Sequence, residues 1–519
     1  MHDCRCIQQT TGPPLRPLPS SHLTAMPARP RQILIALAIS ASCFLLLASL
    51  NSPRLAFPKT YWKLPFADTD GDLGAETSDP AFDNAILDYP YHPNSINVPV
   101  TKIPGGAHSY GFTILDNIYL RNGTFFIVTP DASGFPQRQA LLSAPFDLGE
   151  SDLTANSSHL QFIDPQMAME KLGTSPVRID DFTVVLYDPK QFMTHYYHWW
   201  GEIMLGFWRV YSMLGVQIDG SFASLPFPKR FLLPFVVEDQ WRDRAGINGP
   251  LLRAANPQVS IETSGFWNDL IALDETVVFS RIALINRAAA HKHRLGSLWF
   301  KMMASSMELP VPVGYWEPLR HYVLAGYGIS RLSRASPGNS GRPVVTYISR
   351  QKTGRRLASE AHEGLVRSLR QLEEEGLCDV HIPVMEQLSL KEQIELASWT
   401  TILVGVHGNG LTVHLFVLSR YGSAYTQLTQ HQLWMPPSTR ATVIEIMIPE
   451  GYVYDYEILA RNMGHKHYAI WNDTFVTYPV GQTHEGINYP EGFHGSSIPV
   501  HGPTVASIIR DRLTVAGDV

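Results

Sequence analysis

Residues 401–412, with the sequence Thr-Ile-Leu-Val-Gly-Val-His-Gly-Asn-Gly-Leu-Thr, join an apolar run to a glycine-rich turn. The run at 401–404 predicts a buried strand. The glycines that follow let backbone N–H groups approach an anion closely, and His407 adds a side-chain donor at the same place. The stretch therefore favours a diphosphate site at the end of a strand, although a tight turn without a ligand is the alternative.

Strands and helices alternate around this stretch. The pattern predicts further strands at 344–348, 380–382 and 442–446, and helices at 359–375, 389–398, 455–463 and 505–513. Because strands that alternate with helices and short turns form parallel sheets covered on both faces, this part indicates an α/β unit. Earlier in the chain, strands at 183–187, 231–237 and 276–279 and a helix at 199–214 indicate a second such unit.

The length of the chain, 519 residues, is sufficient for two domains that each bury a core. A stretch rich in Ser, Gly, Pro and Arg at 330–342 separates the two α/β units. We therefore predict one domain at 101–335 and a second at 341–480, followed by a C-terminal tail and helix at 481–519. A ligand is expected in the cleft between the two domains.

Residues 33–50 form an uncharged and almost wholly apolar run. As a helix, this run spans roughly 27 Å, close to the hydrocarbon thickness of a bilayer. Arg29 and Arg31 precede it, so we predict a single-pass type II anchor with a cytosolic tail at 1–32. A cleaved signal peptide is the alternative. Residues 51–100, rich in Pro, Asp and Asn, fit a stem between the membrane and the first domain.

Composition and sequons narrow the functional class and the compartment. The net charge of −6 offers no basic field for nucleic acid. Only Cys378 of the four cysteines lies within the predicted domains, which excludes an intramolecular disulfide framework there. The sequons at Asn122, Asn156 and Asn472 all follow the predicted span, and they predict glycosylation in the lumen of the endoplasmic reticulum or Golgi.

Five short motifs follow one another along the chain. They are His-Tyr-Tyr-His-Trp-Trp-Gly-Glu at 195–202, Tyr-Ile-Ser-Arg at 347–350, Gly-Val-His-Gly-Asn-Gly-Leu at 405–411, Val-Ile-Glu-Ile at 443–446 and Asp-Tyr-Glu-Ile-Leu-Ala-Arg at 455–461. This ordered set resembles glycosyltransferase family 61, which includes secretory-pathway protein O-GlcNAc transferases and plant xylosyl- and arabinosyltransferases. The resemblance covers about residues 180–473. It implies a GT-B architecture, with two Rossmann-like domains facing a cleft, and sugar transfer with inversion.

The resemblance implies a donor site mainly on the second domain, with the first domain binding the acceptor. The candidates for contacts with the donor diphosphate are Arg350, Arg355, Arg356, His407, Gly408, Asn409 and Gly410. Guanidinium groups match phosphate oxygens in shape and charge. A solvated basic surface is the alternative for the arginines, and we expect it for at least one of Arg355 and Arg356. Glu445 interrupts an apolar strand, so it either accepts bonds from the ribose hydroxyls or caps the next turn.

Transfer also needs a base that takes the proton of the acceptor hydroxyl. His198, Glu202 and His195 are the candidates, and we rank His198 first because imidazole titrates near neutral pH. His198 and Glu202 share one face of a helix. The aromatic residues around them fit either a packed cluster or a platform for a sugar. Neither this histidine pair nor the pair at 291 and 293 has an acid or cysteine at a familiar metal-ligand spacing, so we predict no metal and no cofactor besides the UDP-sugar.

Residues 413–430 interrupt the family pattern, which would otherwise continue from Thr412 into an apolar stretch resembling 433–437. The intervening segment is polar and contains glycine where a buried helix should begin. A valine codon begins with GT and Gln430 can be encoded by CAG, so one hypothesis is a retained intron. A genuine surface loop is the alternative. Sequencing the transcript across this junction distinguishes the two.

Together these features predict an inverting glycosyltransferase anchored in the membrane of the secretory pathway through residues 33–50. It would move GlcNAc or xylose from a UDP donor to a glycan or to Ser or Thr of a protein. The alternative is a catalytically inactive, membrane-anchored protein that binds glycans or a partner enzyme.

Overall fold

The computed structural model describes residues 98–515, with gaps at 146–152, 191–192, 218–220, 224, 313, 330–340, 353 and 408–426. These residues all belong to one compact unit, His92–Val519, which is mixed α/β and contains two sheets. The predicted tail, the membrane span and nearly all of the stem lie outside the described residues. Within the described part, no helix combines the length and the apolar character needed to cross a bilayer.

The first sheet, as far as the structure describes it, is mixed and not wholly parallel. Its strands are β1 (His108–Ser109), β2 (Phe112–Arg121), β3 (Thr124–Val128), β4 (Leu160–Ile163), β5 (Val177–Ile179), β6 (Thr183–Leu186), β7 (Arg230–Leu232), β8 (Ser260–Glu262) and β9 (Val277–Ile285). They follow the order β4-β3-β2-β9-β6-β7-β8, with β1 beside β2 and β5 beside β9. The run β9-β6-β7-β8 is parallel, whereas β2 is antiparallel to both β3 and β9.

A hairpin explains this departure from the expected parallel sheet. Asn122 and Gly123 join β2 to β3 with φ values of 48° and 76°. Two successive positive φ values form the tight turn that Asn-Gly favours and that fits the twist of antiparallel strands. Parallel strands need a longer crossover. The expectation of a wholly parallel first sheet is therefore wrong, and the Asn-Gly pair was the signal for it.

The predicted helix at 199–214 is confirmed, but its first part is wider than an α-helix. The π-helical segment η4 (Tyr197–Met204) continues directly into α4 (Leu205–Ser212) and η5 (Met213–Gly215). The remaining helices of this half are η1 (Pro104–Gly106), η2 (Ala132–Gly134), α2 (Arg138–Leu141), α3 (Pro165–Leu172), α5 (Asn248–Ala255), α6 (Ser264–Ala272), α7 (Arg287–Ala290), α8 (Arg294–Trp299), η6 (Met302–Ser306) and α9 (Glu317–Gly326). Extended π-helical hydrogen bonding is rare and is frequent at functional sites.

The second sheet has the order β11-β10-β12-β13-β14-β15 and is parallel except for the hairpin β14–β15. Its strands are β10 (Val344–Ile348), β11 (Asp379–His381), β12 (Thr400–Val406), β13 (Thr442–Met447), β14 (Lys466–Trp471) and β15 (Thr474–Val476). Its helices are α10 (Ser359–Glu374), η8 (Met385–Gln387), α11 (Leu390–Trp399), α12 (Gln427–Trp434), α13 (Asp455–Met463) and α14 (Gly502–Thr514). The strands and helices predicted for this half are confirmed to within a few residues.

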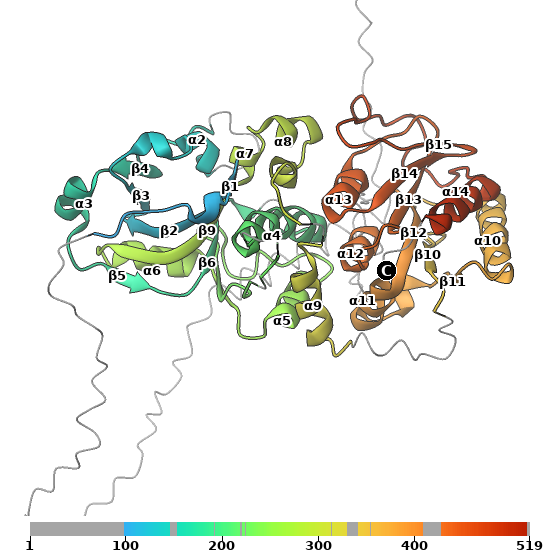
Figure 1. Cartoon of the computed structure of the whole chain (residues 1–519), viewed down its shortest axis with the longest axis horizontal. Coiled ribbons are helices and arrows are strands. Elements are labelled where there is room, and N and C mark those ends of the chain that lie inside the picture. Colours follow the sequence, from blue (N-terminus) through green and yellow to red (C-terminus); the bar gives the residue numbers. More distant parts are fainter. Residues whose placement is uncertain are drawn as a thin grey trace, which may run out of the picture. The chain divides into compact units, whose positions relative to one another are not determined.

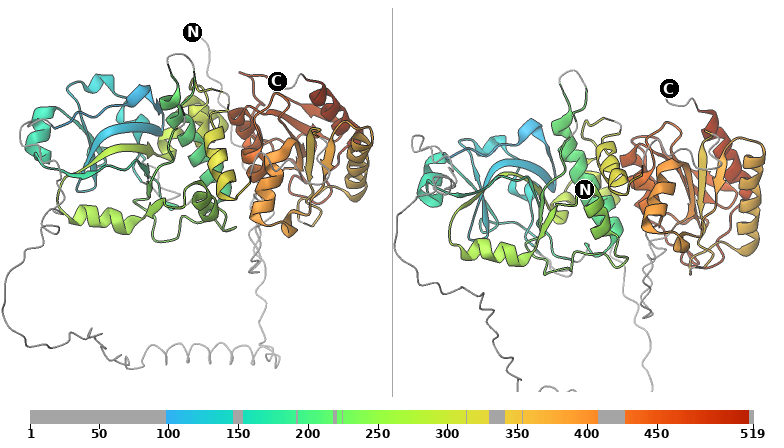
Figure 2. Two further views of the ribbon diagram at one scale, coloured as in Figure 1. Left: turned by 60° about the horizontal axis from the view of Figure 1, so that its bottom comes forward. Right: turned by 90° about the horizontal axis from the view of Figure 1, so that it is seen from below.

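Helices cover both faces of the second sheet, as Figures 1 and 2 show. On one face, Leu365, Leu369 and Leu372 of α10 pack with α14 against Ile402 and Val404 of β12. The leucine spacing of four and three residues places all three on one side of α10. Burying a leucine side chain stabilises the fold by about 1.5–3 kcal/mol. The opposite face is covered by α11, α12 and α13.

The outer edge of β11 is covered by side chains of α10. The guanidinium of Arg370 donates to the carbonyl oxygen of Val380 at 2.9 Å, and the N–H of Val380 donates to Glu373 at 2.9 Å. The outward-facing N–H and carbonyl groups of Val380, the middle residue of this edge strand, are therefore hydrogen-bonded by side chains of α10 and not by a further strand.

Buried contacts join α9 to the end of α12. The indole N–H of Trp316 donates to the carbonyl oxygen of Leu433 at 3.0 Å, and Arg320 donates to that of Trp434 at 2.8 Å. The ring of Trp434 also lies 5.6 Å from that of Trp200 in η4. The chain that follows residue 430 is thus integrated into the core, whereas residues 413–426 of the predicted interruption lie outside the described residues.

Candidate active site

The carboxyl ends of β10 and β12 bring two predicted arginines to one backbone carbonyl. Arg350 follows β10, and Arg355 lies in the next turn. Both are buried, and they donate to the carbonyl oxygen of His407 at 3.3 Å and 3.1 Å. Burial and the neighbouring charge of Arg350 lower the pKa of Arg355 to about 10. Two like charges held this close favour a ligand with more than one negative charge, such as a diphosphate.

His407 continues β12 by one backbone hydrogen bond, from its N–H to the carbonyl oxygen of Ile446 at 2.8 Å. Its ring lies 5.5 Å from that of Tyr456 and 5.2 Å from that of Phe493. Burial, with Arg355 nearby, lowers its pKa to about 3. The imidazole is therefore neutral at physiological pH and fixed within an aromatic pocket.

Glu445 does not fit the ribose contact that we predicted. It lies on β13 with a fully buried side chain. Its Oε1 contacts Nδ1 of His407, and its Oε2 lies 2.8 Å from Nε2 of His467 on β14. Burial raises the pKa of Glu445 well above its usual range. Both oxygens are engaged away from solvent, so the residue is placed to hold the ring of His407 and not to meet a ligand.

The two arginines of the predicted pair, Arg355 and Arg356, make different contacts. Arg355 points its guanidinium at His407 and contacts Nδ1 of His494, while its charge lies 4.8 Å from the ring of Phe493. The backbone N–H of Arg356 donates to the carbonyl oxygen of Gly495 at 3.4 Å, and its carbonyl oxygen accepts from Ile498 at 3.1 Å. Gly408, Asn409 and Gly410 lie outside the described residues.

A second cluster forms around Glu202 on the first half of the chain. The carboxylate is 1% exposed and lies 2.5 Å from Nδ1 of His198, whose side chain is 29% exposed. Its other oxygen accepts from the buried guanidinium of Arg287 at 2.7 Å and from the N–H of Met302 at 3.0 Å. Because Glu202 holds Nδ1 of His198, we assign Nε2 as the ring nitrogen that would take a proton from a substrate.

The charge state of Glu202 makes it an unsuitable base. Burial alone would raise its pKa, but Arg287 and His198 together hold the pKa of Glu202 well below its usual range. A carboxylate of low pKa that already accepts three bonds has little tendency to take a further proton. Its geometry instead matches a residue that orients and stabilises a histidine base.

We expect Glu202→Gln to lower the free energy of unfolding at pH 7 by about 2–3 kcal/mol, since buried Arg287 loses its charged acceptor. A depressed folded-state pKa stabilises the protein above the unfolded-state pKa of about 4.3, and that stability is lost as pH falls through the folded-state value. The difference between wild type and variant should therefore shrink below about pH 4. Urea denaturation at pH 7, 5 and 3 measures it, with exposed Glu374→Gln as the control. Equal stability of wild type and Glu202→Gln at pH 7 would contradict the assigned ion pair.

An ion pair lies beside both clusters. Nζ of Lys301 lies 2.7 Å from Oδ1 of Asp455, the first residue of α13. The hydroxyl of Tyr197 donates to the backbone oxygen of Asp455 at 3.1 Å. Burial opposes ionisation, but Lys301 and also His407 and His198 lower the pKa of Asp455. Asp455 is thus close enough to interact electrostatically with His407 of the first cluster and with His198 of the second.

The third candidate base, His195, lies beside His198 with ring centroids 5.4 Å apart. Burial, together with the charge of His198, lowers the pKa of His195 to about 4. Its Nδ1 already accepts from the N–H of Tyr197 at 3.2 Å. A group of such low basicity removes a proton from a substrate poorly at neutral pH, so His195 is the weaker candidate.

Sequence reasoning missed several residues of these clusters, namely Arg287, Lys301, Asp455, His467 and His494. Each reaches the site through a contact distant in sequence, such as the 85 positions between Glu202 and Arg287. Two local signals were available: Asp455 begins the motif at 455–461, and the charged residue Arg287 interrupts the apolar run at 282–290.

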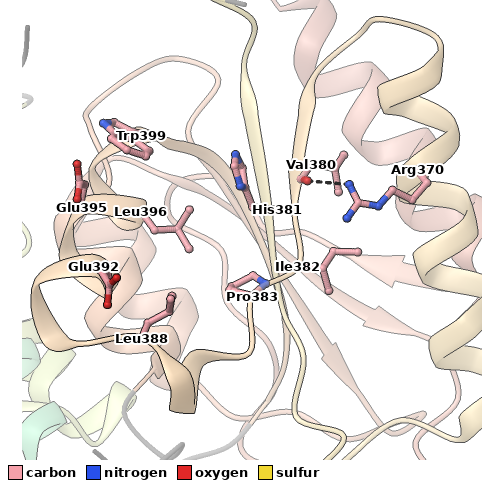
Figure 3. A pocket seen from close by; sticks show the side chains of 10 residues that line it. All are labelled: Arg370, Val380, His381, Ile382, Pro383, Leu388, Glu392, Glu395, Leu396 and Trp399. Carbon is pink, nitrogen blue, oxygen red and sulfur yellow. Dashed lines mark hydrogen bonds between the residues drawn. The ribbon is translucent and has the colours of Figure 1, made fainter. Parts of the chain in front are cut away.

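The sequons and the hollow drawn in Figure 3 involve none of the residues of this site. Asn122 and Asn156 are exposed in turns, and Asn472 is half-buried in the turn between β14 and β15. Figure 3 shows a hollow between β11 and α11, lined by His381, Trp399 and other residues that include none of the predicted site residues. Among the described residues, no group of three or more His, Cys, Asp or Glu side chains is arranged to hold a metal.

Comparison with known proteins gives one family. Residues 196–441 match the family model described as Glycosyltransferase 61. The matched region contains Glu202, Arg355 and His407, while Asp455 and His494 follow it. No curated protein matches the chain.

Proposed function

This chain belongs to glycosyltransferase family 61 through residues 196–441, and we propose that it is an inverting enzyme that uses a UDP-sugar donor. The sugar is GlcNAc or xylose, and the acceptor is a glycan or a Ser or Thr hydroxyl of a glycoprotein. The observation that carries the proposal is the convergence of Arg350 and Arg355 on the carbonyl of His407, at the carboxyl edge of a parallel sheet. In open α/β sheets this edge is where nucleotides bind.

The proposed reaction is a single displacement. Nε2 of His198 takes the proton of the acceptor hydroxyl, and the acceptor oxygen forms a bond to the anomeric carbon of the donor sugar. The bond between that carbon and the diphosphate oxygen breaks on the opposite side, and its electron pair leaves with UDP. Arg350 and Arg355 stabilise the charge that develops on the diphosphate. Since two guanidinium groups supply this charge, the proposed transfer requires no divalent metal.

Glu202 takes a supporting role in this mechanism. Its bond to Nδ1 of His198 fixes the tautomer and stabilises the imidazolium that forms when Nε2 is protonated. Arg287 and the N–H of Met302 hold the carboxylate in place. On the donor side, Glu445 holds the ring of His407 in place through its contact with Nδ1.

We also propose an architecture and a cellular location for the protein. The second sheet and the parallel run β9-β6-β7-β8 support a GT-B arrangement, with the donor on the second half and the acceptor on the first. The apolar run at 33–50 and the sequons support a type II protein of the endoplasmic reticulum or Golgi membrane.

Binding of UDP tests the proposed function. At a UDP concentration of 100 times Kd, ligand linkage adds about 2.7 kcal/mol, which for a unit of this size raises Tm by about 3 °C. The measurement is a thermal shift in the presence of EDTA, with ADP as the control nucleotide. No shift with UDP, UDP-GlcNAc or UDP-xylose would favour the alternative, a catalytically inactive protein that binds glycans or a partner enzyme.

A further inference from the structure

The segment that follows β15 contributes aromatic residues to the candidate site, although it lies beyond the region that matches the family. Tyr452 and Asn488 exchange two backbone hydrogen bonds, of 3.0 Å and 2.9 Å, and the side-chain amide of Asn488 donates to Glu450 at 2.8 Å. These bonds fix the segment just before Tyr489. The position of Tyr489 is therefore set by the fold.

The rings of this segment are arranged around the donor arginine. Phe493 is buried, with its ring 5.2 Å from that of His407 and 4.8 Å from the guanidinium carbon of Arg355. Tyr489 meets Phe493 edge to face at 4.9 Å and stacks on His494 at 5.9 Å, with only 20° between the ring planes. His494 in turn contacts Arg355. Two neighbouring rings thus orient Tyr489.

Tyr489 keeps 57% of its surface exposed. A large aromatic ring that is held from behind and open in front offers a flat apolar face to a ligand. Partial burial raises the pKa of Tyr489, and the charges of Asp455, Lys301 and Arg355 also act on it. The contacts of His494 and Phe493 with Arg355 place the ring beside the donor arginine.

We propose that Tyr489 is a stacking platform for the sugar ring of the nucleotide-sugar donor. The inference rests on the proposed function and specifies where the transferred sugar lies. In a nucleotide sugar, the sugar follows the diphosphate on the side away from the nucleobase. Tyr489 lies beside Arg355, assigned to the diphosphate, through its ring contacts with Phe493 and His494. A platform next to the diphosphate is in reach of the sugar that follows it, and the comparison of UDP with UDP-sugars distinguishes a contact with the sugar from one with the uracil.

The test compares UDP with UDP-GlcNAc and UDP-xylose by isothermal titration. Since an aromatic contact is worth at most about one factor of ten, Tyr489→Ala should weaken binding of the accepted UDP-sugar by up to about tenfold and leave the Kd of UDP unchanged. Tyr489→Phe should retain wild-type affinity for both, because the ring face is kept. Hydrolysis of the UDP-sugar should fall in kcat/KM by the same factor as its affinity.

Phe475→Ala is the matched control, since it removes a 47% exposed ring from β15 that packs on Tyr468. Equal weakening of UDP and UDP-sugar by Tyr489→Ala would place the nucleobase on Tyr489 and overturn the inference. Unchanged binding of both would overturn it as well. A wild-type protein that binds neither UDP nor a UDP-sugar would instead remove the proposed function, and the inference with it. Thermal unfolding of each variant verifies that the fold is intact.

Discussion

Replacing His198 by alanine is expected to lower kcat by about 10³-fold, within the range of 10²–10⁴ that a positioned general base contributes. The reason is that His198 is the partly exposed member of a buried assembly in which Glu202 holds one ring nitrogen. Affinity for UDP should stay within about twofold, since the diphosphate arginines lie on the other half of the chain. Single-turnover transfer with the accepted UDP-sugar measures the loss.

A matched control separates this effect from a general loss of structure. His381→Ala removes an exposed histidine at the end of β11, which is not among the site residues, and should leave turnover unchanged. Added imidazole should restore part of the activity of His198→Ala, because a free base can occupy the vacated space. A variant that turns over within about threefold of wild type would remove His198 from the proton transfer.

The second large effect is expected for Arg355→Ala, which should lower kcat/KM by about 10²–10³-fold, comparable with removing one donor to a developing oxyanion. Unlike the histidine variant, it should also weaken UDP itself, since the guanidinium is assigned to the diphosphate. Arg355→Lys should recover only part of the loss, because an ammonium is a point charge and cannot reproduce the planar fork. Titration of UDP against each variant, together with steady-state transfer, separates binding from turnover.

The control for this prediction is Arg367→Ala, which removes an exposed guanidinium of α10 whose paired carboxylate, Glu363, is 4.0 Å away. It should change neither UDP affinity nor turnover, since exposed pairs contribute little. Retention of full UDP affinity by Arg355→Ala would show that the diphosphate lies elsewhere. Because Arg355 also binds the carbonyl of His407, Tm values must accompany both measurements.

The second half of the fold was predictable because its local signals agree. Ser389 and Glu392 form a capping box at the start of α11, and Gly464 ends α13 with a positive φ of 74°. Such caps depend on neighbours three or four positions away. The strand and turn predicted at 401–407 also depend on residues that are close in sequence, and their buried part is β12.

The features that escaped prediction depend on distant partners. The π-helical bonding of η4 has no local residue signature, and the ion pair of Lys301 with Asp455 joins residues from different halves of the chain. Glu445 was assigned to the ribose because an acid on an apolar strand must be satisfied by something. That partner proved to be a pair of histidines, His407 and His467, and only the register of β13 with β14 brings the second of them into reach.

The covered edge of β11 has a consequence for how copies of the chain behave when they meet at high concentration. An uncovered edge strand is a template on which another chain can add its own strand and begin an aggregate. At one edge of the second sheet, the side chains of Arg370 and Glu373 bond to the outward-facing backbone groups of β11. At the other end, the glycan predicted on Asn472 would project beside β15 and hinder access to it. Both edges of the sheet that carries the donor arginines would then be protected from pairing with a strand of another copy.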